Sequence, residues 1–194
     1  MKLQKIILLL FTLFTITSFS QTEKGKFLIG GTTSFGSSYL TEGDDGFTTT
    51  SSSFIFSSNT GYSFTKNLFA GLNIQFLSNN YKVKFANSEN NTRQIIFSPF
   101  LKYYFLKEKL KPFALIRYGF GKSSSENVNS NGTTNSKSDL TKFNLGGGLS
   151  YFFTDYFSLE FEAFYQRDTS STTIQNDDFK YYGFGTNLGF SIFL

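Results

Sequence analysis

Residues 182–194 read YGFGTNLGFSIFL and alternate between two kinds of side chain. Successive side chains of a β-strand point to opposite faces, so this segment predicts a strand with one apolar face and one small, polar face. The apolar positions are Phe184, Leu188, Phe190, Ile192 and Leu194, and the others are Gly183, Gly185, Asn187, Gly189 and Ser191.

Seven further segments alternate in the same way, and no window after Gln21 keeps the apolar spacing of an amphipathic helix. The segments are residues 26–35, 53–64, 68–76, 93–105, 113–121, 143–153 and 158–166. Alternating segments of about ten residues, separated by turns, are typical of transmembrane β-barrels. The sequence therefore predicts an all-β fold, an eight-stranded antiparallel up-and-down transmembrane β-barrel.

The connections between these segments also alternate in length. Short turns are expected at residues 65–67, 106–111 and 154–156, and long polar loops at 36–52, 77–92, 122–141 and 167–178. Short turns at one end and long loops at the other are typical of the periplasmic and extracellular ends of such barrels. The third loop is rich in serine, asparagine and glycine, so we expect it to be irregular and mobile.

The composition agrees with a barrel in lipid. Aromatic residues make up 20% of the 194 residues, yet hydrophobic residues total 39% and the mean hydropathy is −0.18. A polar lumen and polar loops dilute an apolar outer face, so low hydropathy is compatible with membrane insertion. A soluble β-barrel or sandwich would also alternate, but glycine, serine, threonine and asparagine would then have to cover its outside.

The first twenty residues differ from the rest and predict a signal peptide. Lys2 and Lys5 flank the start of a compact apolar run at residues 6–14, and Ser18 and Ser20 put small residues before Gln21. The run is about half the ~20 residues that a membrane-spanning helix needs. We therefore expect a cleaved signal peptide at residues 1–20 and an exported barrel at residues 21–194.

Several functions are excluded by composition. The chain has no histidine and no cysteine, which rules out a Ser-His-Asp triad, a thiol nucleophile and a Cys/His zinc site. No basic patch points to nucleic acid. Carboxylates in the first and last long loops lack calcium-loop spacing and are expected to be solvated: Glu42, Asp44, Asp45, Asp168, Asp177 and Asp178. We expect no enzyme activity, no cofactor and no metal site.

Four charged residues fall on predicted lumen faces: Lys102, Arg117, Glu160 and Glu162. An eight-stranded barrel is just wide enough for its own side chains to fill it, and isolated buried charges are costly. We therefore expect a structural polar network in the barrel interior. The alternative is that Glu160 and Glu162, which share one strand face, act as catalytic carboxylates or as a gate.

The strand ends beside the short turns carry an aromatic girdle of the kind found at membrane interfaces. Its members are Tyr62, Phe64, Tyr103, Phe105, Tyr151, Phe153 and Phe157.

On these features, the chain resembles the small outer-membrane β-barrel family, of which OmpA- and OmpX-type eight-stranded barrels are familiar members. The resemblance includes the C-terminal assembly signal, carried here by Asn187, Gly189, Ile192 and Leu194, although many members end in an aromatic residue rather than leucine. It implies the outer membrane of a Gram-negative-type envelope. The implied partners are outer-membrane lipid, lipopolysaccharide and the outer-membrane assembly machinery. A monomer is expected, without the peptidoglycan-binding domain of two-domain members.

These expectations favour a non-enzymatic outer-membrane protein with a structural or surface-interaction role through its extracellular loops. One alternative is a porin-like narrow channel, or a carrier for a small molecule, including a hydrophobic one. A soluble periplasmic β-barrel binding protein is a second alternative.

Overall fold

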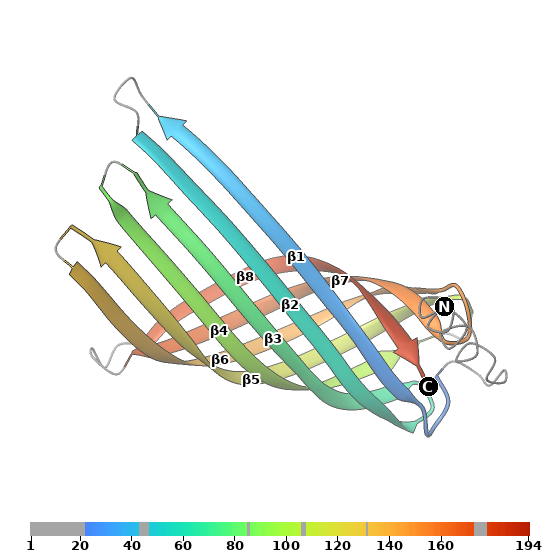
Figure 1. Cartoon of the computed structure of the whole chain (residues 1–194). Helices are drawn as coiled ribbons and strands as arrows, with labels where there is room; N and C mark the ends of the chain where they lie inside the picture. Colours follow the sequence, from blue (N-terminus) through green and yellow to red (C-terminus); the bar gives the residue numbers. More distant parts are fainter. Residues whose placement is uncertain (1–21, 43–46, 85, 106–107, 131, 173–177) are drawn as a thin grey trace, which may run out of the picture.

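The computed structural model describes residues 22–42, 47–84, 86–105, 108–130, 132–172 and 178–194. Eight antiparallel strands form a closed barrel in chain order, with β1 returning to β8 (Figure 1). The strands are β1 (Phe27–Glu42), β2 (Phe47–Thr65), β3 (Leu68–Val83), β4 (Ser88–Tyr104), β5 (Leu110–Asn129), β6 (Gly132–Phe152), β7 (Phe157–Thr172) and β8 (Asp178–Phe193). The predicted fold is confirmed, while the predicted signal peptide lies outside the described residues.

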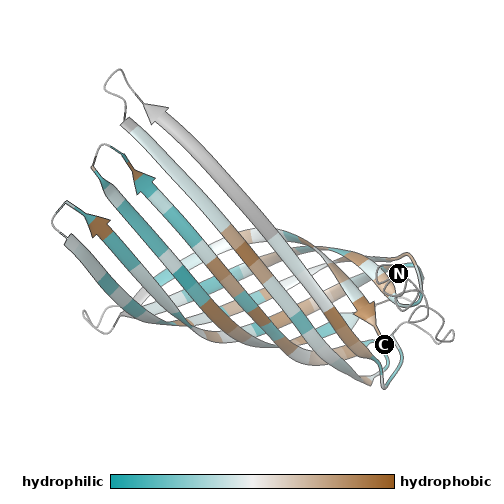
Figure 2. Ribbon diagram, viewed as in Figure 1, coloured by the Kyte–Doolittle hydropathy of each residue, from teal (hydrophilic) through white to brown (hydrophobic). Residues whose placement is uncertain are grey.

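Side chains alternate between the outer surface and the lumen along each strand. On β4, Ile95 and Phe97 are each 43% exposed, whereas Ile96 and Ser98 are 2% and 3% exposed. The apolar residues form a band around the closed part of the barrel (Figure 2). Such a band is what lipid requires on the outside, because its hydrocarbon chains offer no hydrogen-bond partners.

The aromatic girdle lies at the end of the barrel that carries the short turns. Its rings make edge-on contacts, with centroids 5.3 Å apart for Tyr62 and Phe64 and 4.9 Å apart for Tyr151 and Phe153. The short turn between β2 and β3 contains Asn67 with a φ of 68°, a left-handed conformation that asparagine tolerates better than most residues. This end of the barrel agrees with the sequence prediction.

The predicted long loops are wrong over most of their length, because the strands continue through them. The strands have 16 to 21 residues, whereas about 9–11 residues cross a bilayer. In the segment 122–141, β5 and β6 stay paired from Lys122–Asp139 to Asn129–Gly132. Hydrogen bonds between backbones do not need an apolar face, so polar sequence free of proline continues the ladder. The extensions of β3–β4 and β5–β6 are mostly hydrophilic and project at the left of the barrel in Figure 2.

Three of the eight strand-to-strand ladders depart from regular pairing, the β2–β3 ladder only by a register shift between Ser63 and Thr65 beside its short turn. The β4–β5 ladder has no pairs at Ser98 and Pro99, since proline has no N–H to donate. The β1–β8 ladder has five pairs, from Leu28–Phe193 to Thr32–Gly189, against 14 to 20 in the other ladders. Beyond Thr32 and Gly189, the facing edges of β1 and β8 have no partner strand within the described residues. We call this gap the seam.

Candidate functional site in the barrel interior

The polar interior is organised along the lumen face of β7. Glu160, Glu162 and Asp168 are separated by even numbers of residues and so share that face, each closer to the projecting hairpins than the one before. Each carboxylate meets a base from a different strand: β4, β5 or β6. The lumen therefore contains three ion pairs at successive depths.

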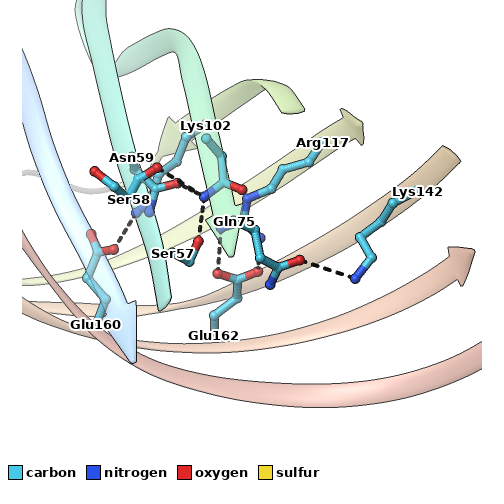
Figure 3. Close-up of polar contacts among 10 residues, drawn as sticks. Ser57, Ser58, Asn59, Gln75, Lys102, Arg117, Lys142, Glu160 and Glu162 are labelled. Atoms are coloured by element: carbon cyan, nitrogen blue, oxygen red, sulfur yellow. Dashed lines mark hydrogen bonds and ion pairs between the residues drawn. The ribbon is translucent and has the colours of Figure 1, made fainter. Parts of the chain in front are cut away.

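The deepest pair joins Lys102 to Glu160 (Figure 3), with 2.6 Å between Nζ and Oε2. The other oxygen of Glu160 accepts hydrogen bonds from Tyr104 Oη at 2.7 Å and Ser150 Oγ at 3.3 Å. The Lys102 ammonium also lies 4.1 Å from the centroid of the Phe113 ring, a favourable cation–π distance. Both charges thus have partners in surroundings that exclude most water.

The second pair joins Arg117 to Glu162 through two parallel hydrogen bonds, Nη1 to Oε1 at 2.6 Å and Nη2 to Oε2 at 2.9 Å (Figure 3). Two-point contact of this kind fixes both planes as well as the distance. The structure therefore brings the four sequence-predicted residues together as two stacked pairs. Carboxylates held this tightly by bases are poorly suited to exchange protons with a substrate.

The third pair, Lys142 and Asp168, was missed by sequence reasoning. Lys142 Nζ lies 3.5 Å from Asp168 Oδ2 and donates to Gln75 Oε1 at 3.3 Å. Lys142 lies between the predicted loop 122–141 and the predicted strand 143–153, and Asp168 lies in the predicted loop 167–178. The prediction of a solvated loop carboxylate at Asp168 is wrong because β6 and β7 extend past it. Of the other loop carboxylates, Asp44, Asp45 and Asp177 lie outside the described residues.

Around the two deeper pairs and below them, toward the short turns, apolar side chains fill the lumen. We call this group the aromatic floor: Leu28, Phe69, Phe100, Tyr104, Phe113, Leu115, Phe152 and Phe193. Phe69, Tyr104 and Phe193 are completely buried, and their ring centroids lie 5.6–6.0 Å apart. The space left around Lys102 and Arg117 is about 10 Å³, the least that holds one water molecule.

A polar cap closes the floor at the short-turn end. Thr22 is 1% exposed, donates to Asn67 Oδ1 at 2.5 Å, and accepts from Lys111 Nζ at 3.2 Å. Lys111 is itself 2% exposed, and its ammonium lies 4.7 Å from the Phe152 centroid. The lumen is thus occupied by side chains from the cap to the Arg117–Glu162 pair.

Above that pair the lumen widens into a cavity of about 810 Å³, which we call the vestibule. Amides line much of its wall: Asn73, Gln75, Asn79, Gln94, Asn144, Gln166 and Asn187. Asn73 Nδ2 donates hydrogen bonds to Ser57 Oγ at 2.6 Å and Asn59 Oδ1 at 2.9 Å. Three buried atoms of lining residues, Arg117 Nε, Asn79 Oδ1 and Asp168 Oδ1, have no hydrogen-bond partner within the described chain.

The predicted assembly-signal residues lie along β8 and at the chain end. Asn187 lines the vestibule, and Gly189 forms the last β1–β8 pair, where a Cβ would approach Thr32 Cγ2 to 2.5 Å. Ile192 pairs with Ile29 and Phe157, and Leu194 exchanges backbone hydrogen bonds with Phe27. The role of these residues in assembly stays a prediction.

Two further observations bear on the class of protein. No helix among the described residues is long and apolar enough to cross a membrane. Within the same residues, no group of three or more histidine, cysteine, aspartate or glutamate side chains is placed to hold a metal ion.

Comparison with solved structures finds the same barrel fold. The chain is similar to OprG from Pseudomonas aeruginosa, with 15% identity, a TM-score of 0.50, and coverage of 91% of this chain and 99% of OprG. The N-terminal barrel domain of Pseudomonas aeruginosa OprF shows 17% identity, a TM-score of 0.44, and coverage of 88% and 98%. Ail, the attachment invasion locus protein of Yersinia pestis, shows 15% identity, a TM-score of 0.45, and coverage of 88% and 99%.

At the sequence level, no curated protein matches significantly. Residues 6–191, however, match the family described as outer membrane protein beta-barrel domain. The match includes nearly all of the strands described above, and the barrel fold, the apolar band and the polar lumen agree with it. The chain belongs to the outer membrane protein beta-barrel domain family.

Proposed function

We propose that this outer-membrane barrel is non-enzymatic and that it works as a surface-interaction protein through its projecting hairpins. The observation that carries the proposal is the length of the strands. At 16 to 21 residues they exceed the ~9–11 needed to cross the bilayer, and the excess forms paired polar hairpins rather than irregular loops. A rigid sheet outside the membrane presents its side chains in a fixed array.

The chemistry of the hairpins favours partners that are recognised by hydrogen bonding. In the extension of β5 and β6, the charges of Lys122 and Lys137 are balanced by Glu126 and Asp139, and the other side chains are mostly hydroxyls and amides. Hydroxyl-rich surfaces such as polysaccharides offer matching donors and acceptors. Because the hairpin has no net charge, we expect its binding to depend little on salt.

The filled lumen argues against a channel through the barrel. The aromatic floor and the two deep ion pairs would have to separate before an ion could pass. We therefore expect no discrete conductance steps when the purified barrel is added to a planar bilayer.

The experiment is to shorten one hairpin without disturbing the barrel. Ser123 and Ser138 face each other six residues before the pair Asn129–Gly132, which flanks the native turn. Hydrogen-bonded and non-hydrogen-bonded pairs alternate along an antiparallel ladder, so a spacing of six gives both pairs the same hydrogen-bonding pattern. Replacing residues 124–137 by Asn-Gly, which forms a tight hairpin turn, keeps that pairing intact. We expect heat-modifiable gel mobility to be unchanged, and retention of proteoliposomes on polysaccharide-coated beads and intact cells to fall.

A variant with residues 124–137 kept in place but with Lys137 and Glu126 exchanged is the matched control, and it should bind like the wild type. Equal retention of the wild type and the shortened barrel would contradict the surface role of this hairpin. Conductance steps in the wild type would contradict the closed lumen.

A further inference from the structure

The seam opens in the outer half of the apolar band. Pairing of β1 with β8 ends at Thr32 and Gly189, five residues from the chain-end contact of Phe27 with Leu194. At ~3.3 Å per residue along strands tilted by ~40°, five residues correspond to a height of roughly 13 Å above the short-turn edge of the apolar band. The band itself is ~25 Å tall. The unpaired edges therefore begin near the middle of the bilayer.

The vestibule extends into this opening. Strand alternation would place Thr33 on the outer face of β1, with Ile29, and Thr186 and Leu188 on the outer face of β8, with Phe190. All three nevertheless line the vestibule. Leu188 is 74% exposed and Phe184, four residues away on the same face, is 89% exposed. The two hairpins that flank the seam stand apart in Figure 1. Unpaired backbone at membrane depth is tolerated where it borders a cavity that admits water, and the vestibule is such a cavity.

The apolar residues that line the vestibule lie on the seam side, next to polar residues of β1 and β8 such as Thr32, Thr186 and Asn187, whereas the opposite wall is polar. Ile55 on β2 and Phe164 on β7 line it close to the seam, together with Leu188. The Phe164 ring lies against the inner side of β8 at Gly185. Any larger residue there would bring its Cβ to 2.5 Å from the ring, so the contact requires glycine. Strands β4 to β6, across the barrel, contribute amides and the two ion-paired bases.

The polar wall suits an uncharged head that both donates and accepts hydrogen bonds. Arg117 is paired with Glu162 and Lys142 with Asp168, so the two bases have no charge left over for an anionic ligand. One buried donor, Arg117 Nε, and two buried acceptors, Asn79 Oδ1 and Asp168 Oδ1, lack partners in the described chain. Hydroxyl and amide groups satisfy donors and acceptors alike.

We propose that the vestibule binds a single-chain amphiphile with an uncharged, hydroxyl- or amide-bearing head, and that the amphiphile reaches it from the outer leaflet through the seam. The head lies against the amides of β4 to β6, and the alkyl chain passes between Thr33 and Leu188 into lipid. This inference concerns the lumen and does not depend on the surface role of the hairpins.

The test uses a monoacylglycerol with a photoreactive group in its head, added to the barrel in lipid vesicles. The chain has no cysteine, so Thr33→Cys with Leu188→Cys creates a unique thiol pair across the seam. A short bis-methanethiosulfonate reagent bridges the pair, and a reductant removes the bridge. We expect the probe to label peptides containing Gln94 or Asn144, the bridge to abolish that labelling, and reduction to restore it.

The matched control is Thr60→Cys with Leu72→Cys, which face each other in the continuous β2–β3 ladder on the lipid side. Bridging this pair should leave labelling unchanged, and heat-modifiable gel mobility verifies that both variants are folded. Labelling that survives the seam bridge would show access from water and overturn the seam route. Absence of lumen labelling in the wild type would overturn the site. Equal labelling by a fatty acid with the same photoreactive group would overturn the uncharged head.

Discussion

The inner and outer halves of this barrel use the same strands but are stabilised differently. In the inner half, between the short turns and Arg117, the lumen is filled by the aromatic floor and two close ion pairs. In the outer half, the lumen is a polar cavity of about 810 Å³, and the strands continue as hairpins with little apolar surface. Tight packing stabilises the first half, whereas backbone pairing and a few polar side-chain contacts, such as those of Lys142 with Asp168 and Lys82 with Glu89, hold the second together.

The inner half of the barrel therefore provides most of the stability, and the outer half carries the side chains available for recognition. The well-packed half tolerates few substitutions, because each side chain has many neighbours and little water. The outer half leaves side chains free to vary without loss of the fold. Substitutions at matched positions in the two halves test this division.

Loss of the deepest carboxylate should have the largest effect. Glu160→Ala leaves Lys102 buried without its counter-ion and Tyr104 without its acceptor, so we expect a loss of about 3–5 kcal/mol in the free energy of unfolding. Urea unfolding of the barrel in lipid vesicles measures it. The double variant Lys102→Met with Glu160→Met removes both charges and should be much closer to the wild type. A single variant as stable as the wild type would show that water reaches this depth.

A charge on the lipid face should cost somewhat less. Leu72→Arg places a guanidinium near the midplane of the apolar band, where we expect a loss of about 2–4 kcal/mol. Ser78→Arg lies on the same face of β3 near the outer edge of the band and should cost about 0–1 kcal/mol. Equal losses for the two variants, in the same urea titration, would contradict the assigned position of the band.

The outermost ion pair should matter least. Lys142 and Asp168 are 3.5 Å apart and border the vestibule, where water screens their attraction. We therefore expect Lys142→Ala to change the free energy of unfolding by about 0–1 kcal/mol. A loss comparable to that of Glu160→Ala would mean that the outer lumen is as tightly packed as the floor.

The period-two alternation was enough to predict the barrel and its lipid-facing residues. Every second residue of a membrane-spanning strand faces lipid and is therefore apolar. The aromatic floor did not follow, because Phe69, Phe100, Phe152 and Phe193 interrupt the alternation. Each adjoins a lipid-facing apolar residue, and such neighbouring apolar pairs beside the short turns were the available signal. Two neighbouring apolar residues indicate a level of the barrel at which one side chain faces lipid and the other is buried in a lumen without water.

The charged interior was predicted in part. Lys102, Arg117, Glu160 and Glu162 were placed in the lumen by parity, but parity does not say which base meets which acid, because that depends on the register around the barrel. Lys142 and Asp168 lay beyond the ten-residue segments that the apolar alternation defines. Polar strand extensions have no apolar periodicity, so their length is set by backbone pairing that composition does not reveal.

The missing pairs at Ser98 and Pro99 have a mechanical consequence. They interrupt the β4–β5 ladder, and four strands separate that ladder from the seam on either side of the cylinder. The barrel is thus two four-stranded sheets joined along two weak lines at opposite ends of a diameter. A cylinder jointed in this way bends more easily into an oval than a uniform one, and pressure from the surrounding bilayer would act on the vestibule along that soft direction.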